Sequence, residues 1–237
     1  MITRTSRCPL RRNRPMDTRN GLSGVAAGGA AAGSGASAAT LVVLISGGGR
    51  TLVRLAEAIA RGELAARILT VIASRECAGC ERARELGLSV RVMPGVIAPE
   101  DLEGAACGAE WIVLAGYLKL VRVPEAYRGR IVNIHPALLP SFGGRGMYGQ
   151  HVHAAVLAAG CKVSGCTVHL VDEAFDRGPI VLQRTCEVLE GDTPEALAAR
   201  VFAVECGAYV EALRLLIAGR VRVAGGRAEV DGEGARA

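Results

Sequence analysis

Asn133 and His135 are the side chains whose spacing first indicates a site. They end an apolar run, Ile131-Val-Asn-Ile-His135, and Pro136 follows. On an extended strand, residues i and i+2 point to the same side, so an amide and an imidazole would face one space. Pro136 disfavours helical geometry at His135, which predicts that the strand ends there. Ligands bind at the carboxyl ends of strands in open α/β sheets, so the pair is a candidate site. The alternative is a strand-end histidine that bonds a loop carbonyl.

The segment Ser46-Gly-Gly-Gly-Arg-Thr51 predicts an anion site between a strand and a helix. Backbone N–H groups of such a loop, together with the helix N-terminus, bind negative charge. The spacing is not GxGxxG and no P-loop lysine follows, so a single phosphate monoester fits better than a dinucleotide or a nucleoside triphosphate. Arg50 or the hydroxyl of Thr51 could add a contact. Alternatively, the glycines serve only the tight turn.

An acidic loop follows the strand that is expected to carry His169. It contains Asp172, Glu173 and Asp176. Three such carboxylates are usually solvated, and His169 fits a packed core position or a site position equally well. No G-x-S-x-G nucleophile motif is present in the sequence.

The cysteines and the remaining histidines do not form a recognised metal pattern. Cys77-Ala-Gly-Cys80 has the spacing of a redox pair or half a zinc site, but no second CxxC and no HxxxH follows. His151 and His153 have no recognised ligand spacing with the acids, so we expect no metal. Without a secretory signal, the eight cysteines are expected to be reduced thiols. We expect Cys77 and Cys80 to lie in a loop, with a thiol-redox role as an alternative.

The net positive charge of this 237-residue chain comes from its first 40 residues. Residues 1–40 hold six arginines and one acid, so they account for the whole net charge of +5. A nucleic-acid-binding domain would carry its own basic face, so no nucleic-acid partner is expected. No apolar run approaches the ~20 residues of a membrane span. We expect a cytoplasmic protein. An organellar address within residues 1–39 is the alternative, because that segment is rich in arginine and poor in acids.

Apolar periodicity predicts alternating strands and helices after Thr40. Thr193 followed by Pro194 predicts a helix start, and Gly219 predicts its end. The expected strands are 41–45, 68–73, 90–92, 111–115, 131–135, 165–171 and 180–187, with a hairpin at 220–223 and 228–230; the expected helices are 51–61, 81–86, 154–159 and 194–218.

This alternation predicts an α/β protein with a Rossmann-like, mainly parallel twisted sheet flanked by helices. The last strands have no long helix between them and therefore predict an antiparallel edge. We expect a disordered tail at residues 1–39, one catalytic domain at 40–223, and a hairpin remnant and tail at 224–237.

Four motifs occur along the chain in a defined order: Leu44-Ile-Ser-Gly-Gly-Gly, Val113-Leu-Ala-Gly-Tyr117, Asn133-Ile-His-Pro-Ala-Leu-Leu-Pro-Ser-Phe142 and Asp176-Arg-Gly-Pro-Ile-Val-Leu-Gln183. Together they resemble the phosphoribosylglycinamide formyltransferase family over about Leu41 to Val223. That resemblance implies the formyltransferase fold and formyl transfer from 10-formyltetrahydrofolate, as co-substrate, to 5-phosphoribosylglycinamide in purine synthesis. It implies small-molecule substrates, no metal, and a monomer or homodimer.

The resemblance also implies the site residues. Matched motif by motif, the catalytic residues are Asn133, His135 and Asp176. The substrate-binding residues are Gly49, Arg50, Thr51 and Glu205, and the folate-binding residues are Leu118, Lys119, Leu120, Val121, Asn133 and Asp172.

The implied chemistry is an attack by the amine on the formyl carbon, which develops a tetrahedral oxyanion. Asn133 would donate a hydrogen bond to the oxyanion. His135 would stabilise it as imidazolium and move the proton between the two nitrogens. Asp176 would raise the pKa of His135 by favouring its charged form.

The chain departs from the family in the segment after Phe142. Gly143-Gly144 replaces the usual Pro-Gly, and a longer Arg-Gly-Met-Tyr-Gly segment precedes His153. Phe202 stands where a polar residue is more common. The nearest rival function is formyltetrahydrofolate deformylase, a hydrolase with a similar site, whose motif tends to have a second histidine at the position of Pro136. A non-catalytic phosphosugar-binding protein would need the glycine loop without Asn133, His135 and Asp176.

Overall fold

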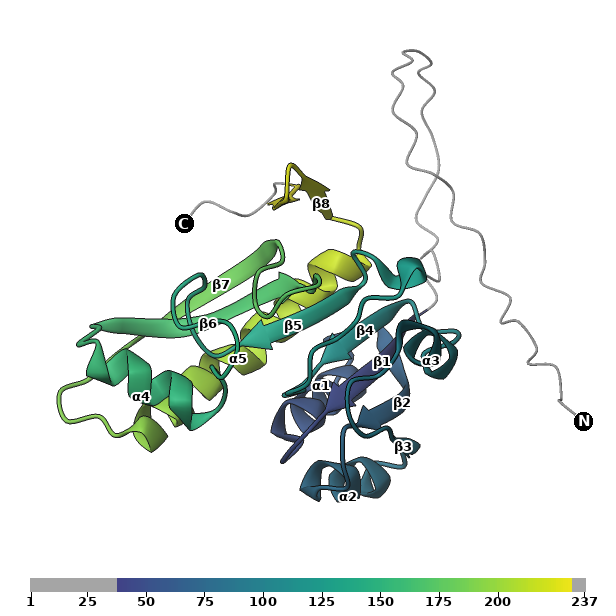
Figure 1. The fold of residues 1–237 in the computed structure, drawn as a ribbon, viewed down its shortest axis with the longest axis horizontal. Coiled ribbons are helices and arrows are strands. Elements are labelled where there is room, and N and C mark those ends of the chain that lie inside the picture. Colours follow the sequence, from purple (N-terminus) through teal and green to yellow (C-terminus); the bar gives the residue numbers. More distant parts are fainter. Residues whose placement is uncertain (1–37, 232–237) are drawn as a thin grey trace, which may run out of the picture.

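A seven-stranded sheet runs through the centre of the computed structural model, which describes residues 38–231 (Figure 1). Its strand order is β3-β2-β1-β4-β5-β6-β7. A separate two-stranded hairpin, β8 and β9, follows the last helix. The strands are β1 (Ala39–Ile45), β2 (Ala66–Ala73), β3 (Val90–Val92), β4 (Trp111–Leu114), β5 (Ile131–His135), β6 (Val163–Leu170), β7 (Ile180–Glu187), β8 (Val221–Ala224) and β9 (Arg227–Val230).

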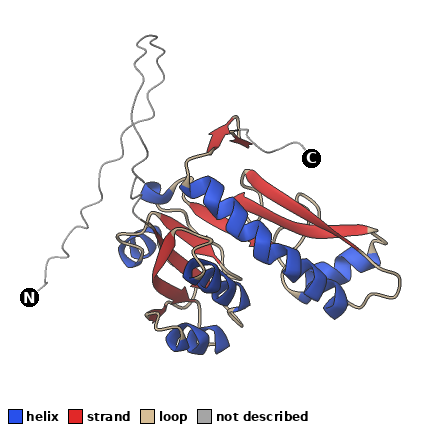
Figure 2. Ribbon diagram, turned by 180° about the vertical axis from the view of Figure 1, so that it is seen from behind, coloured by secondary structure: helices blue, strands red, loops and turns tan. Residues whose placement is uncertain are grey.

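Helices cover both faces of the sheet. The 24-residue helix α5 lies along the half of the sheet that contains β6 and β7 (Figure 2). The helices are α1 (Arg50–Ala60), α2 (Ala78–Glu85), α3 (Pro99–Ala105), the 3₁₀ helix η1 (Glu125–Tyr127), α4 (Gln150–Ala158) and α5 (Pro194–Ile217).

The sheet is parallel from β3 to β5, whereas β6 and β7 pair antiparallel to their neighbours. This arrangement confirms the predicted α/β class with an antiparallel edge. The chain order reverses direction across the sheet between β1 and β4, which is the point where open α/β sheets bind ligands. The loops after β1, β4 and β5 therefore share one edge.

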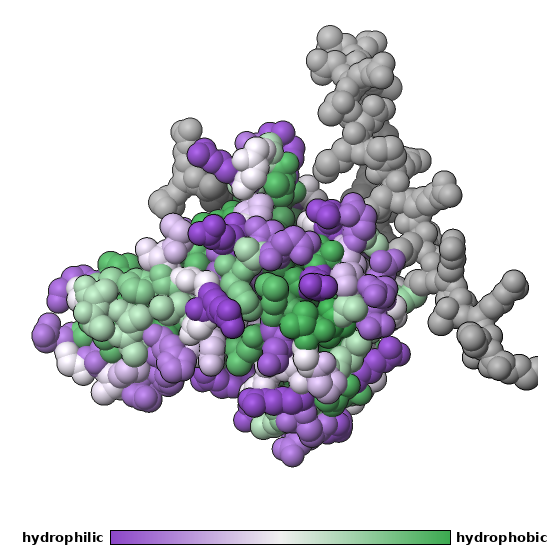
Figure 3. All heavy atoms as spheres, viewed as in Figure 1, coloured by the Kyte–Doolittle hydropathy of each residue, from purple (hydrophilic) through white to green (hydrophobic). Residues whose placement is uncertain are grey.

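Strand alternation produces two apolar layers. Leu41, Val43 and Ile45 face the layer that contains residues of α1, α2, α4 and α5. Val42 and Leu44 face the opposite layer, which contains residues of α3 and η1. Since both faces of β1 are buried, the strand reads as a continuous apolar run. On the face seen in Figure 3, apolar side chains form patches in the middle of the molecule and at its left end, with hydrophilic side chains between and around them.

Helices α2, α3 and α4 differ from the sequence-based prediction. Helix α3 was not predicted, because its seven residues bury only Leu102 and so lack an apolar stripe. Helix α4 begins at Gln150, four residues before the predicted start, directly after Gly149 with φ 55°. Helix α2 begins at Ala78, so the prediction that Cys80 lies in a loop is wrong.

The ends of the chain bear on the predicted domains. The tail predicted at 1–39 lies outside the described residues except for positions 38 and 39, and Ala39 already belongs to β1. The proposed boundary at residue 223 falls inside the β8–β9 hairpin. In the described part of the chain, no helix is long and apolar enough to cross a membrane.

The described cysteines do not all have the same state. Free thiols are present at Cys77, Cys80, Cys161, Cys166, Cys186 and Cys206. Cys107 is disulfide-bonded, so the expectation of reduced thiols is wrong for that residue.

Candidate active site

Strand β5 delivers Asn133 and His135 to the carboxyl edge of the sheet. The strand ends at His135, as Pro136 predicts, and both side chains border a cavity of about 780 Å³. Antiparallel pairing with β6 places Asn133 opposite His169. The local sequence thus determines the positions of Asn133 and His135, and the pairing of β5 with β6 places His169 beside them.

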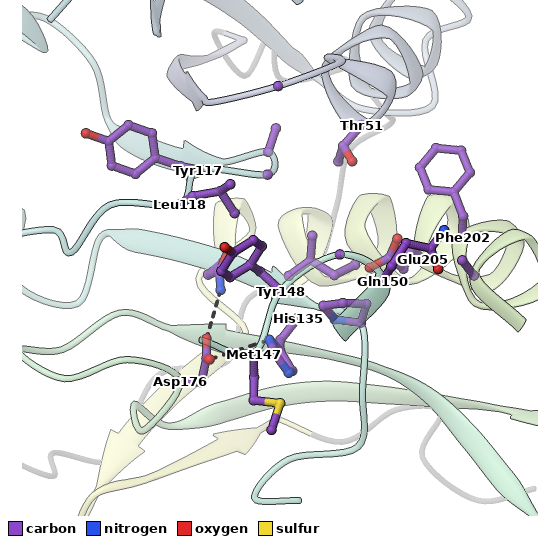
Figure 4. Close-up of a pocket in the computed structure, with 18 of the residues that line it drawn as sticks. Thr51, Tyr117, Leu118, His135, Met147, Tyr148, Gln150, Asp176, Phe202 and Glu205 are labelled. Atoms are coloured by element: carbon purple, nitrogen blue, oxygen red, sulfur yellow. Dashed lines mark hydrogen bonds and ion pairs between the residues drawn. The ribbon is translucent and has the colours of Figure 1, made fainter. Parts of the chain in front are cut away.

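Asp176 reaches the same point from the loop between β6 and β7 (Figure 4). Its Oδ2 atom lies 3.5 Å from Nδ1 of His135, and its Oδ1 atom lies 3.4 Å from Nδ2 of Asn133. The backbone at Asp176 adopts a left-handed conformation with φ 57°. The next turn is held close to β6, because a Cβ atom on Gly178 would overlap the carbonyl oxygen of Leu170. The three predicted catalytic side chains are therefore in contact.

The segment that departs from the family pattern supplies a further contact to Asp176. The Gly144 N–H donates a hydrogen bond to Oδ2 of Asp176 at 2.9 Å. A Cβ atom on Gly143 would lie 3.3 Å from Cβ of Asp176 and would overlap the side chain of Leu139. Glycine at position 143 thus allows the loop to pack against the carboxylate.

The hydrogen bonds of His135 define its tautomer. Nε2 lies 2.8 Å from the carbonyl oxygen of Phe142, which can only accept, so Nε2 carries a proton. Nδ1 is therefore the atom that faces Asp176. The ring is only 4% exposed. Burial lowers the pKa of His135 below its ordinary value, although the charge of Asp176 and the bond to Phe142 both favour the charged form. The expectation that Asp176 raises this pKa is correct for its own contribution but wrong for the net direction.

The carboxyl of Asp176 is held in its ionised form. Burial raises its pKa, but the bonds and positive charge of His169 and His135 in their protonated forms, together with the Gly144 N–H bond, outweigh burial, so the pKa lies below the ordinary value. Before reaction, the site accordingly pairs a carboxylate with a largely neutral imidazole.

His169 belongs to the site, although the sequence left its position ambiguous. Its Nδ1 atom lies 2.9 Å from the carbonyl oxygen of Leu170 and must donate to it. Nε2 is then free to accept from Nδ2 of Asn133, at 3.1 Å. This bond orients the amide of Asn133 with its NH₂ group toward His169 and Asp176.

The glycine loop borders the same cavity. Gly49 precedes α1 with φ 73°, and the cavity is also lined by Arg50 and Thr51. The first N–H groups of a helix have no intrahelical partner, so they are available to an anion. The guanidinium of Arg50 lies over the ring of Phe202, 4.3 Å from its centroid. Phe202 therefore contacts Arg50 through the face of its ring, at a position where a polar residue was expected.

Glu205 lies on α5 at the end of the cavity that also holds Thr51 and Phe202 (Figure 4). Its side chain is partly buried. Burial raises its pKa to about 7, and the charge of Arg50 opposes this rise. Glu205 is therefore a carboxyl that changes charge near neutral pH.

Not every predicted folate-binding residue borders the cavity. Leu118 and Lys119 line it, and the Leu118 N–H donates to Oγ of Ser46 at 2.9 Å, which ties this segment to the glycine loop. Val121 packs instead in the apolar layer of α3. Leu120 and Asp172 are also absent from the lining, and Asp172 accepts a bond from the Ala174 N–H. The folate-binding role of these three residues stays a prediction.

The cavity has further walls that the sequence did not identify as site residues. They come from the segment between β5 and α4 and from α4 itself, and include Met147, Tyr148, Gln150 and His153. His153 is buried, which lowers its pKa. These residues belong to no recognised motif. The one signal in the sequence that they line the site is that they follow Phe142 closely. Among the described residues, no group of three or more His, Cys, Asp and Glu side chains is arranged to hold a metal ion.

Comparison with known proteins identifies the family. The formyl transferase family model matches residues 39–213. The chain belongs to the formyl transferase family. It is 39% identical over 189 residues to the chloroplastic phosphoribosylglycinamide formyltransferase of Arabidopsis thaliana, covering 75% of this chain and 65% of that protein. The chain thus spans slightly less than two thirds of that relative's length.

Solved structures of a transformylase and of a deformylase have a similar fold. The glycinamide ribonucleotide transformylase 1 of Symbiobacterium toebii matches with a TM-score of 0.73 and 38% identity, over 81% of this chain and 93% of that one. A formyltetrahydrofolate deformylase of Pseudomonas syringae matches with a TM-score of 0.68 and 26% identity, over 81% of this chain and 66% of that one.

Proposed function

We propose that this formyl transferase moves the formyl group of 10-formyltetrahydrofolate to the amine of 5-phosphoribosylglycinamide. The observation that carries the proposal is the contact of Asn133, His135 and Asp176 at the edge of the cavity that the glycine loop also lines. The names of the Arabidopsis and Symbiobacterium relatives support the same substrate.

The cavity suggests how two substrates are arranged. The substrate phosphate would bind at Gly49, Arg50 and Thr51, where helix α1 begins. Glu205, at the same end, would accept hydrogen bonds from sugar hydroxyls. The folate would enter along Leu118 and Lys119, with the predicted contacts of Leu120, Val121, Asn133 and Asp172. The amine and the formyl carbon would then meet beside His135.

His135 would act first as a base. Its lowered pKa keeps the ring neutral, and its Nδ1 atom is the nitrogen without a proton. As the amine attacks, its proton can pass to Nδ1, and the resulting imidazolium lies 3.5 Å from the carboxylate of Asp176. The imidazolium then returns the proton to the leaving folate nitrogen. General acid–base catalysis of this kind contributes about 10²- to 10⁴-fold.

Asn133 would stabilise the oxyanion by giving up its hydrogen bond to Asp176 and donating one to the oxyanion. Its NH₂ group donates to His169 at 3.1 Å and, more weakly, to Asp176 at 3.4 Å. The longer bond is the one that a developing negative charge could replace. One such donor is worth about 3 kcal/mol in the transition state. The sequence of steps requires no metal ion.

The rival hydrolase reaction would use water in place of the amine. A deformylase needs the polar cluster around His135 but has no need of a phosphate site or of Glu205. The deciding experiment measures formyl transfer from 10-formyltetrahydrofolate to 5-phosphoribosylglycinamide beside formate release without the acceptor. We expect acceptor-dependent transfer. Formate release at an equal rate without acceptor would overturn the proposal in favour of the deformylase.

Compartment and assembly are part of the proposal. We infer small-molecule substrates, no nucleic-acid or membrane partner, and a monomer or homodimer. The cytoplasm is the proposed compartment. The Arabidopsis relative is named as chloroplastic, which supports the alternative of an organellar address within residues 1–39.

A further inference from the structure

Cys77 and Cys80 form a close thiol pair at the start of α2. Cys77 is the residue before the helix, and Cys80 lies in its first turn. Their sulfur atoms are 3.7 Å apart, and the Cys80 N–H donates to the carbonyl oxygen of Cys77 at 2.8 Å. Cys77 is partly exposed, whereas Cys80 is buried. Of the two cysteines, Cys77 is therefore the one on the solvent side.

Other functions of this pair are less well supported. Zinc needs about four ligands, and within the described part of the chain the two thiols belong to no group of three or more His, Cys, Asp and Glu side chains arranged to hold a metal ion. Cys80 packs in the apolar layer of α1 and α5, as a structural cysteine would. Cys77 packs against the edge of the same layer, but it is partly exposed and its sulfur lies at hydrogen-bond distance from that of Cys80.

We propose that Cys77 and Cys80 are a redox-active dithiol that exchanges with low-molecular-weight disulfides. The thiolate of Cys77 attacks one sulfur of the external disulfide, forms a mixed disulfide and releases one thiol. The thiolate of Cys80 then attacks Sγ of Cys77 and releases the second thiol. The protein loses two protons and two electrons, and the external disulfide gains them.

The pair is linked to the glycine loop through Gly79, which lies between the two cysteines. The Gly79 N–H donates to the carbonyl oxygen of Gly47 at 2.9 Å. A Cβ atom on Gly79 would lie 2.6 Å from that oxygen and 3.1 Å from the backbone nitrogen of Gly49. Arg82, one turn further along α2, also donates to the carbonyl oxygen of Gly48. The first turn of α2 therefore packs directly against the loop.

Formation of the disulfide would shorten the distance between the two sulfurs from 3.7 Å to about 2 Å. The proposal extends to the glycine loop: the constraint on the first turn of α2 is passed to the Gly47–Gly49 loop, because Gly79 is in close contact with Gly47 and Gly49. This second step rests on the proposed function, in which that loop binds the substrate phosphate. Oxidation should then weaken binding of 5-phosphoribosylglycinamide and leave binding of the folate nearly unchanged.

The dithiol is tested independently of enzyme activity. The full-length native protein is equilibrated with oxidised glutathione, quenched with acid, alkylated and mapped by peptide mass. We expect the peptide that contains both cysteines to lose two hydrogens. In Cys80→Ser, Cys77 should instead retain a glutathione adduct, while Cys161→Ser, a matched change at another partly exposed thiol, should behave as wild type. A peptide that stays reduced in the native wild type, or an adduct that persists there, would overturn the proposal.

The link to substrate binding has its own measurement. KM for each substrate is compared before and after oxidation, and again after reduction with dithiothreitol. We expect KM for 5-phosphoribosylglycinamide to rise about tenfold, as the loss of one hydrogen bond to a charged group would cause, and to recover on reduction. The Cys77→Ser/Cys80→Ser variant should show no change. If the disulfide forms and both KM values stay constant, the coupling is wrong although the dithiol is real; if neither redox form transfers formyl groups, the proposed function itself has failed.

Discussion

Nδ1 of His135 lies 3.5 Å from Oδ2 of Asp176. Because the opposite ring nitrogen is held by a backbone carbonyl, Nδ1 is the atom at which a proton can arrive and leave. In the proposed reaction, the carboxylate is therefore placed to stabilise the imidazolium. Burial favours a neutral ring before that step, so in the proposed cycle burial and the carboxylate affect the pKa of His135 at different stages.

Replacement of Asp176 by Asn tests this division of roles. The variant should lose about 10²- to 10⁴-fold in kcat, because the imidazolium loses its counter-charge. The pKa of His135, already lowered by burial, should fall further without the carboxylate. Since His135 must be neutral to accept a proton, activity falls at low pH. The acid limb of the pH–rate profile should therefore lie below pH 6.5 in wild type and move to still lower pH in the variant.

The control for this experiment is Glu173→Gln in the same loop, which removes an exposed carboxylate. Its profile should match wild type. An Asp176→Asn profile that keeps its acid limb at the wild-type position would show that the limb does not report His135.

Asn133→Ala should affect the chemical step more than substrate binding. The amide donates most strongly when charge develops on the formyl oxygen, so kcat should fall by about 10²- to 10³-fold with a small change in either KM. The measurement is steady-state kinetics with each substrate varied in turn. A large rise in KM at constant kcat would instead make Asn133 a ground-state binding residue.

The sequence allowed prediction of those parts of the site that local pattern encodes. The end of β5 followed from an apolar run and Pro136, and the glycine loop from its position between a strand and a helix. Asp176 could be assigned only through family resemblance, because a solvated acidic loop has the same composition. His169 required the register of β5 with β6, which is a tertiary property.

The sequence also did not allow prediction of the net direction of pKa shifts. The charge of Asp176 predicted a raised pKa for His135, but the degree to which the fold buries the ring decided the direction. Likewise, the close contact of Gly79, beside Cys80, with the glycine loop joins two segments that are distant in the sequence. The local order of residues does not determine how deeply a side chain is buried or which distant backbone segments are in contact.

Two glycine substitutions should have opposite effects on stability. Gly178→Ala places a methyl group against the carbonyl oxygen of Leu170, so the loop that holds Asp176 must move. We expect a loss of about 1–3 kcal/mol and a reduced kcat. Gly207→Ala lies within α5, where nothing is within 4 Å of the added atom. It should stabilise the protein by about 0.5–1 kcal/mol. Urea unfolding measures both, and a Gly178→Ala protein as stable and active as wild type would contradict the proposed role of the turn.

Glu205 should make the stability of the protein depend on pH near neutrality. Burial raises its pKa from an ordinary value of 4.5 to about 7, so the folded protein binds this proton more tightly than the unfolded chain does. The resulting contribution to stability is fully present below about pH 4.5 and is lost as pH rises through about 7. Glu205→Gln cannot ionise and avoids this loss.

The comparison is therefore between wild type and Glu205→Gln at pH 5 and at pH 8. The free energy of unfolding of the variant, relative to wild type, should increase between the two pH values by about 1–3 kcal/mol. Glu211→Gln is the matched control, since Glu211 lies on the same helix but is exposed and paired with Arg184. Its effect should be at most about 1 kcal/mol at either pH, as for surface ion pairs. If the Glu205→Gln difference is the same at pH 5 and pH 8, Glu205 is already ionised in the folded protein, and burial does not control its charge.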